Sequence, residues 1–262
     1  MEKDRALKTG LYDIEYLEKV TLMNWVQKYK KLSFEFLEIK TGSILLDAGC
    51  GTGDDVLVLS KLVGDKGKVI GIDIAEEMIK EAKEKTKDIP NIELYQANIY
   101  ELDFDDNTFD GVRADRVFQH LEHPTKALKE LVRVTKSGGN IIVMDPDWTT
   151  LVLDHPNKDF TDRYLSYQTT IITNPSSGTK LANMFLDQGL QDVTVVPDVL
   201  YLRNYNEANI VWMIETYIDK AINEGVFQKE EAIAWIKEFK TLNEKNRFFG
   251  ALTGFGVGGT KP

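Results

Sequence analysis

The chain has 262 residues, a single cysteine, and a net charge of −10 from 42 acidic and 32 basic side chains. That length suffices for one large domain with additions, and a lone cysteine excludes an internal disulfide. The acidic balance, without any basic run, disfavours nucleic acid as a partner. The apolar runs are too short to span a bilayer and the first twenty residues are charged throughout. We therefore expect a cytoplasmic protein without membrane insertion, monomeric or homodimeric, whose partner is a small molecule.

Residues 11–40 are expected to form helices that carry several aromatic side chains, among them Tyr16. We predict that residues 1–40 contribute to a substrate pocket. Residues 41–262 are predicted to form the core, with a helical insertion at about 205–245.

A short apolar strand over residues 43–47 leads into a turn with glycine at every second position. The strand ends in Asp47, the glycines of the turn are Gly49, Gly51 and Gly53, and a helix is expected to begin near Asp54. Glycine adopts unusual φ values and lets the backbone approach a ligand closely. A strand, a glycine-rich turn and a helix together predict the nucleotide pocket of an open α/β sheet.

The composition of this turn narrows the choice of nucleotide. A dinucleotide fingerprint needs a third glycine where Asp54 stands, and the carboxylates of Asp54 and Asp55 would repel a pyrophosphate at the helix N-terminus. No Gly-Lys-Ser/Thr follows, so a P-loop is excluded. A ligand with a nucleoside, no phosphates and a positive centre fits better, and S-adenosylmethionine is such a ligand.

The next strands continue the α/β pattern. Residues 68–73 form a predicted second strand that ends in Asp73, placed to accept hydrogen bonds from a ribose diol. A surface helix is predicted over 75–87, a third strand over 92–96 and a fourth over 111–114. The alternation predicts a doubly wound sheet.

In this order and spacing, the motifs resemble the class I S-adenosylmethionine-dependent methyltransferases, in the small-molecule group that includes the ubiquinone- and menaquinone-type enzymes. The matching segments are 46–53, 71–74, 109–112, 118–121 and 128–139. The resemblance implies a Rossmann-like, seven-stranded and mostly parallel sheet whose last strand is antiparallel. It also implies S-adenosylmethionine as cofactor, with S-adenosylhomocysteine as product.

The resemblance further implies roles for individual residues in binding the cofactor. It assigns Asp47, Gly49, Gly51 and Gly53 to the methionine end, Asp73 and its neighbour Ile74 to the ribose side, and Asn98 and Ile99 to the adenine. The family usually carries Asp at the position of Asn98, whose amide oxygen can still accept a hydrogen bond.

Two residues after the fourth strand are candidates for direct roles in the reaction. His120 is the candidate general base, with a packing or capping role as the alternative. Arg116 could hold the methionine carboxylate or an acidic substrate, or simply pair with Asp115 on the surface. No histidine or cysteine cluster has metal-ligand spacing, so no metal is expected.

Substrate choice is expected to depend on the second half of the chain. A fifth strand is predicted over 140–144, a polar and aromatic stretch over 151–178, a helix over 179–188 and a sixth strand over 189–196. Helices over 207–224 and 228–243 could cover the pocket as a lid or simply cover the sheet. A glycine-rich seventh strand over 247–260 is expected at or near the edge of the sheet. The substrate candidates are Tyr16, Trp148, Arg163, Tyr167 and Arg203.

The function predicted from these observations is methyl transfer from S-adenosylmethionine to an oxygen, nitrogen or carbon atom of a small metabolite. A protein of the same fold that binds the cofactor for other chemistry, such as cyclisation, or for regulation is the alternative. A nicotinamide-dependent oxidoreductase is disfavoured by the Asp54-Asp55 pair.

Overall fold

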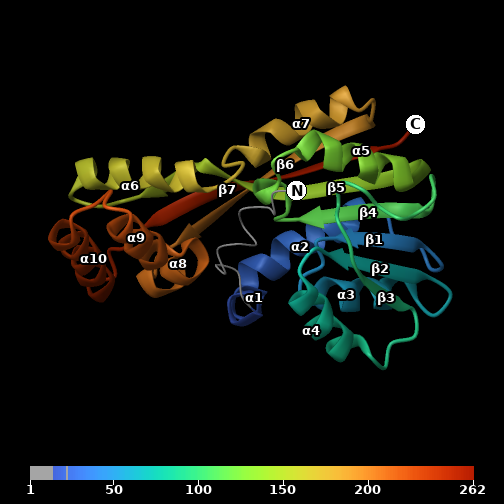
Figure 1. Cartoon of the computed structure of the whole chain (residues 1–262), viewed down its shortest axis with the longest axis horizontal. Coiled ribbons are helices and arrows are strands. Elements are labelled where there is room, and N and C mark those ends of the chain that lie inside the picture. Colours follow the sequence, from blue (N-terminus) through green and yellow to red (C-terminus); the bar gives the residue numbers. More distant parts are fainter. Residues whose placement is uncertain (1–13, 22) are drawn as a thin grey trace.

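The computed structural model describes residues 14–21 and 23–262, and within them helices cover both faces of a seven-stranded sheet (Figure 1). The strands are β1 (Ile44–Ala48), β2 (Lys68–Asp73), β3 (Ile92–Gln96), β4 (Phe109–Asp115), β5 (Thr135–Leu153), β6 (Gln191–Leu202) and β7 (Gly250–Thr260). Their order is β3-β2-β1-β4-β5-β7-β6, and β7 runs antiparallel to both of its neighbours while the other pairs are parallel. The predicted Rossmann-like sheet is confirmed, with β7 next to the edge strand β6.

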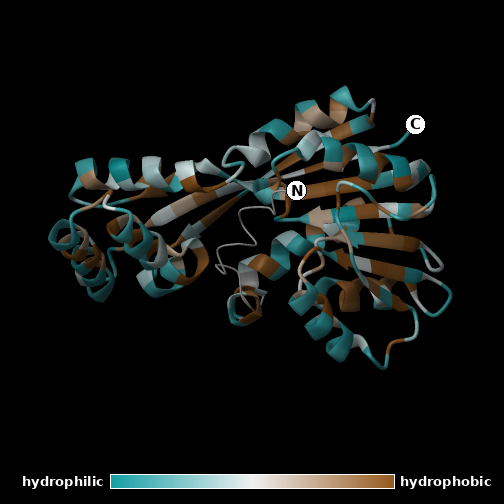
Figure 2. Cartoon of the chain, in the orientation of Figure 1, coloured by the Kyte–Doolittle hydropathy of each residue, from teal (hydrophilic) through white to brown (hydrophobic). Residues whose placement is uncertain are grey.

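Two helical layers bury the apolar faces of this sheet (Figure 2). On one face lie α5 (Pro124–Val134) and α7 (Ser177–Asp187), which pack on the inner strands. On the other lie α1 (Ile14–Thr21), α2 (Asn24–Phe36), α3 (Asp54–Val63) and α4 (Glu76–Thr86). The parallel strands are therefore apolar on both sides, as their sequences predict.

Strands β5, β6 and β7 extend past the ends of the other four strands into a second lobe with its own core (Figure 1). The helices of this lobe are α6 (Lys158–Ile171), α8 (Tyr205–Trp212), α9 (Ile214–Asn223) and α10 (Lys229–Glu244). Aromatic side chains dominate the lobe, and Trp212, Trp235 and Phe239 are each at most 1% exposed. Helices α6, α8, α9 and α10 thus form the hydrophobic core of this lobe.

Three predicted elements differ from the structure. The fifth strand is far longer than 140–144, and α6 occupies a stretch that lacked a clear helical pattern. The helix predicted over 207–224 is two helices, because Met213 adopts a left-handed conformation with φ 51° between them. His120 lies at the end of a 3-10 turn, η1 (Phe118–His120), which precedes α5.

Candidate active site

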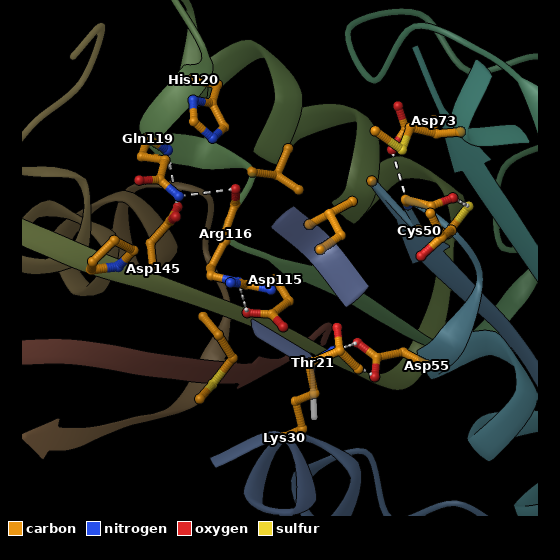
Figure 3. A pocket seen from close by; sticks show the side chains of 18 of the residues that line it. Thr21, Lys30, Cys50, Asp55, Asp73, Asp115, Arg116, Gln119, His120 and Asp145 are labelled. Carbon is orange, nitrogen blue, oxygen red and sulfur yellow. Dashed lines mark hydrogen bonds and ion pairs between the residues drawn. The ribbon is translucent and has the colours of Figure 1, made fainter. Parts of the chain in front are cut away.

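A cavity of about 680 Å³ opens at the carboxyl ends of the parallel strands. The β1–α3 turn, the ends of β2 and β4, the middle of β5, and parts of α1, α2, α8 and β7 line it. Ligands of open α/β sheets bind at this edge. Figure 3 shows Asp73 and Cys50 on one side of the cavity and Gln119, His120 and Asp145 on the other, with Asp115 and Arg116 between them.

The glycine turn presents bare backbone to the cavity. Gly49 and Gly51 have positive φ values of 83° and 51°, and both line the cavity. The N–H groups of Gly49 and Cys50 donate to the carbonyl oxygen of Ile72 at 2.7 and 2.9 Å, which ties the turn to β2. A Cβ atom on Gly49 would lie 2.3 Å from Cγ2 of Val117, so only glycine fits there.

Gly53 has a different position from its two predecessors. It is the N-cap of α3 and packs against Ala82 of α4, and it is not among the residues that line the cavity.

Burial raises the pKa of the Cys50 thiol well above its usual range, so the thiol stays protonated. A nucleophilic role for Cys50 is therefore disfavoured.

Asp73 lies at the end of β2 with its carboxylate in the cavity. Its Oδ2 accepts a hydrogen bond from the Gly51 N–H at 3.0 Å, and its Oδ1 accepts one from the Ala75 N–H at 2.9 Å. Each oxygen retains lone-pair capacity for a ligand. Burial raises the pKa of Asp73, and its backbone hydrogen bonds oppose that shift.

Beside Asp73, Ile74, Asn98 and Ile99 also line the cavity. The side-chain oxygen of Asn98 accepts a hydrogen bond from the Tyr100 N–H at 3.0 Å. This contact fixes the amide next to the end of β3. The predicted ribose and adenine residues are thus brought together on one side.

A buried ionic cluster, which sequence reasoning missed, lies beneath the middle of the cavity. Arg113 of β4 is 1% exposed, and its guanidinium lies 2.9 Å from Asp47 and 3.0 Å from both Asp55 and Asp115. Lys30 of α2 adds a second cation, 2.8 Å from Asp55. The sequence does contain a signal for this cluster: Arg113 is a charged residue inside a strand, and the neighbouring motifs contain several aspartates.

The pKa values of this cluster reflect a balance of burial and charge. Burial raises the pKa of Asp47 to about 6, although Arg113 opposes the shift. At Asp55 burial also acts upward, but the charges of Arg113 and Lys30 prevail and lower the pKa. Asp47 does not line the cavity, so its carboxylate serves Arg113 and has no direct access to a ligand there.

His120 lies on the opposite side of the cavity from Asp73, and Arg116 lies between the two sides (Figure 3). Arg116 has a left-handed backbone conformation with φ 57°, and its buried Nε atom has no hydrogen-bond partner among the described residues. Burial and the charge of Arg116 lower the pKa of His120 to about 4. The imidazole is therefore neutral at physiological pH.

The predicted substrate residues divide into two groups. Tyr16 and Trp148 line the cavity, and the Trp148 indole N–H donates to Gln119 Oε1 at 2.7 Å. Arg163, Tyr167 and Arg203 do not line it. Their partners lie in the second lobe, because α6 and the distal ends of the long strands carry these residues away from the sheet edge.

The partners of these three side chains are local. Arg163 forms ion pairs with Asp159 and Glu231, and the Tyr167 hydroxyl donates to Glu224 at 2.7 Å. Arg203 donates to the carbonyl oxygens of residues 248 and 246. These three side chains are therefore paired within the second lobe and do not contact the cavity.

Within residues 14–21 and 23–262, no group of three or more His, Cys, Asp or Glu side chains is arranged to hold a metal ion. No helix in the same described part is long and apolar enough to cross a membrane.

Comparison with known proteins gives consistent matches. A family model described as "Methyltransferase domain" matches residues 39–189. A demethylmenaquinone methyltransferase of Shouchella clausii is 31% identical over 202 residues, 70% of this chain and 85% of the relative. A 37.1 kDa protein of unknown role in a Streptomyces fradiae transposon is 31% identical over 242 residues, 92% of this chain and 69% of the relative.

Solved structures share the fold at low sequence identity. The YcgJ protein of Bacillus subtilis has a TM-score of 0.62 at 21% identity, covering 90% of this chain and 98% of its own. Phosphoethanolamine N-methyltransferase 2 of Haemonchus contortus, in complex with S-adenosyl-L-methionine, has a TM-score of 0.66 at 17% identity, covering 100% of this chain and 60% of its own.

Proposed function

The chain belongs to the methyltransferase domain family of S-adenosylmethionine-dependent enzymes, and from this premise we propose that it methylates an oxygen, nitrogen or carbon atom of a small metabolite. The observation that carries the proposal is one cavity with two chemically distinct sides. Asp73 and the glycine turn form one side, Gln119 and His120 form the other, and Arg116 lies between them. S-adenosylmethionine supplies a methyl group already activated on a sulfonium ion.

The charge of the cavity supports this cofactor over a dinucleotide. Its lining residues include eight acidic side chains and two basic ones, Lys30 and Arg116. An acidic cavity attracts a sulfonium and an ammonium group and repels a pyrophosphate. At the start of α3, Asp54 accepts a hydrogen bond from Thr52 and Asp55 pairs with Lys30 and Arg113, so the helix N-terminus is already occupied by carboxylates.

The predicted cofactor residues suit different parts of S-adenosylmethionine. The bare backbone of Gly49 and Gly51 permits close approach, and the remaining lone pairs of Asp73 suit a ribose diol. The Nε atom of Arg116 has no hydrogen-bond partner among the described residues and lies 3.9 Å from Asp115 Oδ1, so the guanidinium can still bind the cofactor's carboxylate. Asp47 acts differently: it holds Arg113, which in turn positions Asp55 and Asp115 at the cavity.

His120 is proposed to hold the acceptor beside the activated methyl group. Its pKa of about 4 makes it a hydrogen-bond acceptor for an O–H or N–H group. Full proton transfer to it near pH 7 would cost about 4 kcal/mol, because the pKa lies roughly three units lower. His120 is therefore better suited to orienting a methyl acceptor that is already nucleophilic than to removing a proton from a weakly acidic one.

Calorimetry on ligand-stripped protein tests the cofactor. Micromolar binding of S-adenosylmethionine and S-adenosylhomocysteine without binding of NAD is expected, followed by a screen of metabolites for methyl uptake. Binding of NAD alone, or of none of the three, would overturn the proposal.

A second candidate is non-methylation chemistry in the same pocket. A [4+2]-cyclase shares the fold with a TM-score of 0.55 at 18% identity, so this architecture also carries cyclase activity. Cofactor binding without methyl uptake by any metabolite in the screen would favour this candidate.

A further inference from the structure

Arg116 is held in an unusual backbone conformation at the cavity. Its N–H donates to the Met144 carbonyl oxygen at 2.7 Å, and its carbonyl oxygen accepts a hydrogen bond from the Gln119 side chain at 3.1 Å. These contacts keep a residue other than glycine in the left-handed region, with φ 57°. Such a conformation is costly and is typically retained at functional sites. Figure 3 shows the residue between the two sides of the cavity.

The two Nη atoms of Arg116 are accessible and unpaired. Within residues 14–21 and 23–262 its guanidinium makes no hydrogen bond, and its one ion pair, with Asp115, is long at 3.9 Å. Among its nitrogens only Nε is both unpaired and buried, so Nη1 and Nη2 are the accessible donors. The side chain is 24% exposed and lines the cavity. A ligand in the cavity can therefore reach these donors.

The neighbours of Arg116 do not use its charge. Asp115 Oδ2 already accepts hydrogen bonds from Arg113 at 3.0 Å and from the Tyr29 hydroxyl at 3.1 Å. Lys30, the other basic residue that lines the cavity, is held in an ion pair of 2.8 Å, and its side chain is only 6% exposed. Among the described residues that line the cavity, Arg116 is therefore the basic group that is left for an anion.

The properties of His120 also favour an acceptor that is already ionised. Burial and the charge of Arg116 lower the pKa of His120 to about 4, so near pH 7 it is a weak base for an acceptor that has to lose a proton. A carboxylic acid has lost its proton at that pH without any help. The same charge that keeps His120 neutral attracts a carboxylate.

We propose that the methyl acceptor is a carboxylic acid, that Arg116 binds its carboxylate through the Nη donors, and that the product is the methyl ester. One guanidinium can hold more than one carboxylate, as Arg113 does here, so contact with the cofactor's carboxylate leaves donors for the acceptor. In the transfer a carboxylate oxygen bonds to the methyl carbon, the carbon–sulfur bond breaks and its electron pair stays on sulfur, so no proton moves. The inference names the substrate class of the proposed methyl transfer and rests on that function.

The acidic side chains of the cavity do not prevent an anion from binding at Arg116. Asp55 and Asp115 are compensated by Arg113. The bound cofactor has a net positive charge, because its sulfonium and ammonium groups outnumber its carboxylate. A carboxylate at this place therefore lies next to two positive groups, the guanidinium and the sulfonium.

Matched pairs of fragments test the recognition. Phenylacetate and 3-phenylpropionate carry a carboxylate on a ring that suits the Trp25 and Trp148 lining, and phenylacetamide and 3-phenylpropionamide are their neutral counterparts of equal size. All four are titrated by ligand-observed NMR, at pH 7, into the full chain saturated with S-adenosylhomocysteine. We expect each acid to bind about tenfold or more tightly than its amide, because charge-assisted hydrogen bonds are about twice as strong as neutral ones. Absence of acid binding overturns the inference, and so does equal binding, the result expected if the cofactor's carboxylate takes up the whole guanidinium.

Variants assign the preference to one side chain. Arg116→Gln keeps hydrogen-bond donors but removes the charge, so it should lose the preference for acids. Arg163→Gln is the matched control, because Arg163 pairs with Asp159 and Glu231 in the second lobe, and it should keep the preference in full. Each variant is measured at a concentration of S-adenosylhomocysteine that saturates it, which also shows that it is folded. If Arg116→Gln kept the preference, or if Arg163→Gln lost it to the same extent, the inference would be wrong.

The stability of the methylated product gives a test that does not depend on fragments. Metabolites that take up a radiolabelled methyl group in the screen are treated with mild alkali, which hydrolyses methyl esters to volatile methanol and leaves methyl ethers, methylamines and carbon-bound methyl groups intact. We expect the label to become volatile. A label that stays in alkali-stable products overturns the carboxylate acceptor and leaves methyl transfer itself in place, whereas a wild-type protein that binds no S-adenosylhomocysteine refutes the proposed function.

Discussion

Replacing Arg113 with methionine removes the charge on which three buried carboxylates depend. In the native protein the guanidinium lies within 3.0 Å of Asp47, Asp55 and Asp115. Its Nε–H also donates a hydrogen bond to the Ser33 hydroxyl at 2.8 Å. Methionine has similar bulk but no charge. The variant therefore leaves buried carboxylates without compensation, which is the costly way to break a buried ion pair.

The expected loss at pH 7 is about 3–5 kcal/mol in the free energy of unfolding. One carboxylate can reduce that cost by taking up a proton. Because the pKa of Asp47 is about 6 even with Arg113 present, protonating it at pH 7 costs only about 1.4 kcal/mol. At pH 5 Asp47 is already neutral, so the difference between variant and wild type should shrink by about 1 kcal/mol.

The sign of this pH effect follows from linkage. The folded-state pKa of Asp47 is raised above its unfolded value, so its contribution to stability is present at low pH and is lost as the pH rises through about 6. The folded-state pKa of Asp55 is lowered, so Asp55 stays ionised at pH 5 and still needs Arg113. Most of the loss should therefore persist at pH 5.

Urea unfolding at pH 7 and pH 5 measures both effects. Arg163→Met is the matched control, because Arg163 also pairs with two carboxylates but its side chain is 43% exposed. Exposed pairs contribute about 0–1 kcal/mol, so this variant should be nearly as stable as the wild type. If Arg113→Met lost no more than Arg163→Met, or if its loss grew towards pH 5, the account of the buried cluster would be refuted.

Three further predictions concern the cavity itself. Asp73→Ala should weaken S-adenosylhomocysteine binding about 100-fold or more in calorimetry, because two charge-assisted hydrogen bonds of roughly 1.5–3 kcal/mol each are lost; unchanged affinity would remove its ribose role. An NMR titration of His120 should have its midpoint near pH 4, so its contribution to stability is lost as the pH falls from 6.5 to 4, and a midpoint near 6.5 would contradict its burial. Gly49→Ala should destabilise the protein by about 2–4 kcal/mol in urea unfolding, because of its φ of 83° and the 2.3 Å approach to Val117, and adding Val117→Ala should recover part of this; a loss below about 1 kcal/mol would show that the turn can rearrange.

The parallel half of the fold could be predicted because its signals are local. Each strand there is an apolar run bounded by turn residues, and Asp47, Gly49 and Asp73 mark the strand ends. Chain order and the right-handed crossover rule then place those ends on one edge of the sheet. Of the cofactor residues predicted on the Asp73 side, Gly53 and Asp47 do not line the cavity, whereas the others do, and their roles in binding the cofactor stay predictions.

The second lobe could not be predicted in the same way because its signals are tertiary. The strand over 135–153 contains one proline, two aspartates and three threonines that interrupt an alternating pattern, and pairing with β7 holds it extended along most of its length. Arg163 and Tyr167 are predicted substrate contacts because they lie in the second half of the chain, on which substrate choice is expected to depend. Their helix, α6, instead faces the aromatic core and the acidic side chains of α9 and α10.

The distribution of charge explains how one cavity suits both a cationic cofactor and an acceptor without positive charge. Asp55 and Asp115 are compensated from below by Arg113 and Lys30, so the cavity is acidic without leaving these carboxylates unpaired in the protein interior. On the opposite side the low pKa of His120 keeps its imidazole neutral, and the raised pKa of Asp145 favours a neutral carboxyl there. Figure 3 shows Arg116 between the two sides of the cavity, beside Asp115. A cationic acceptor that approaches His120 would meet this guanidinium, so we expect amines to bind there only in their uncharged form.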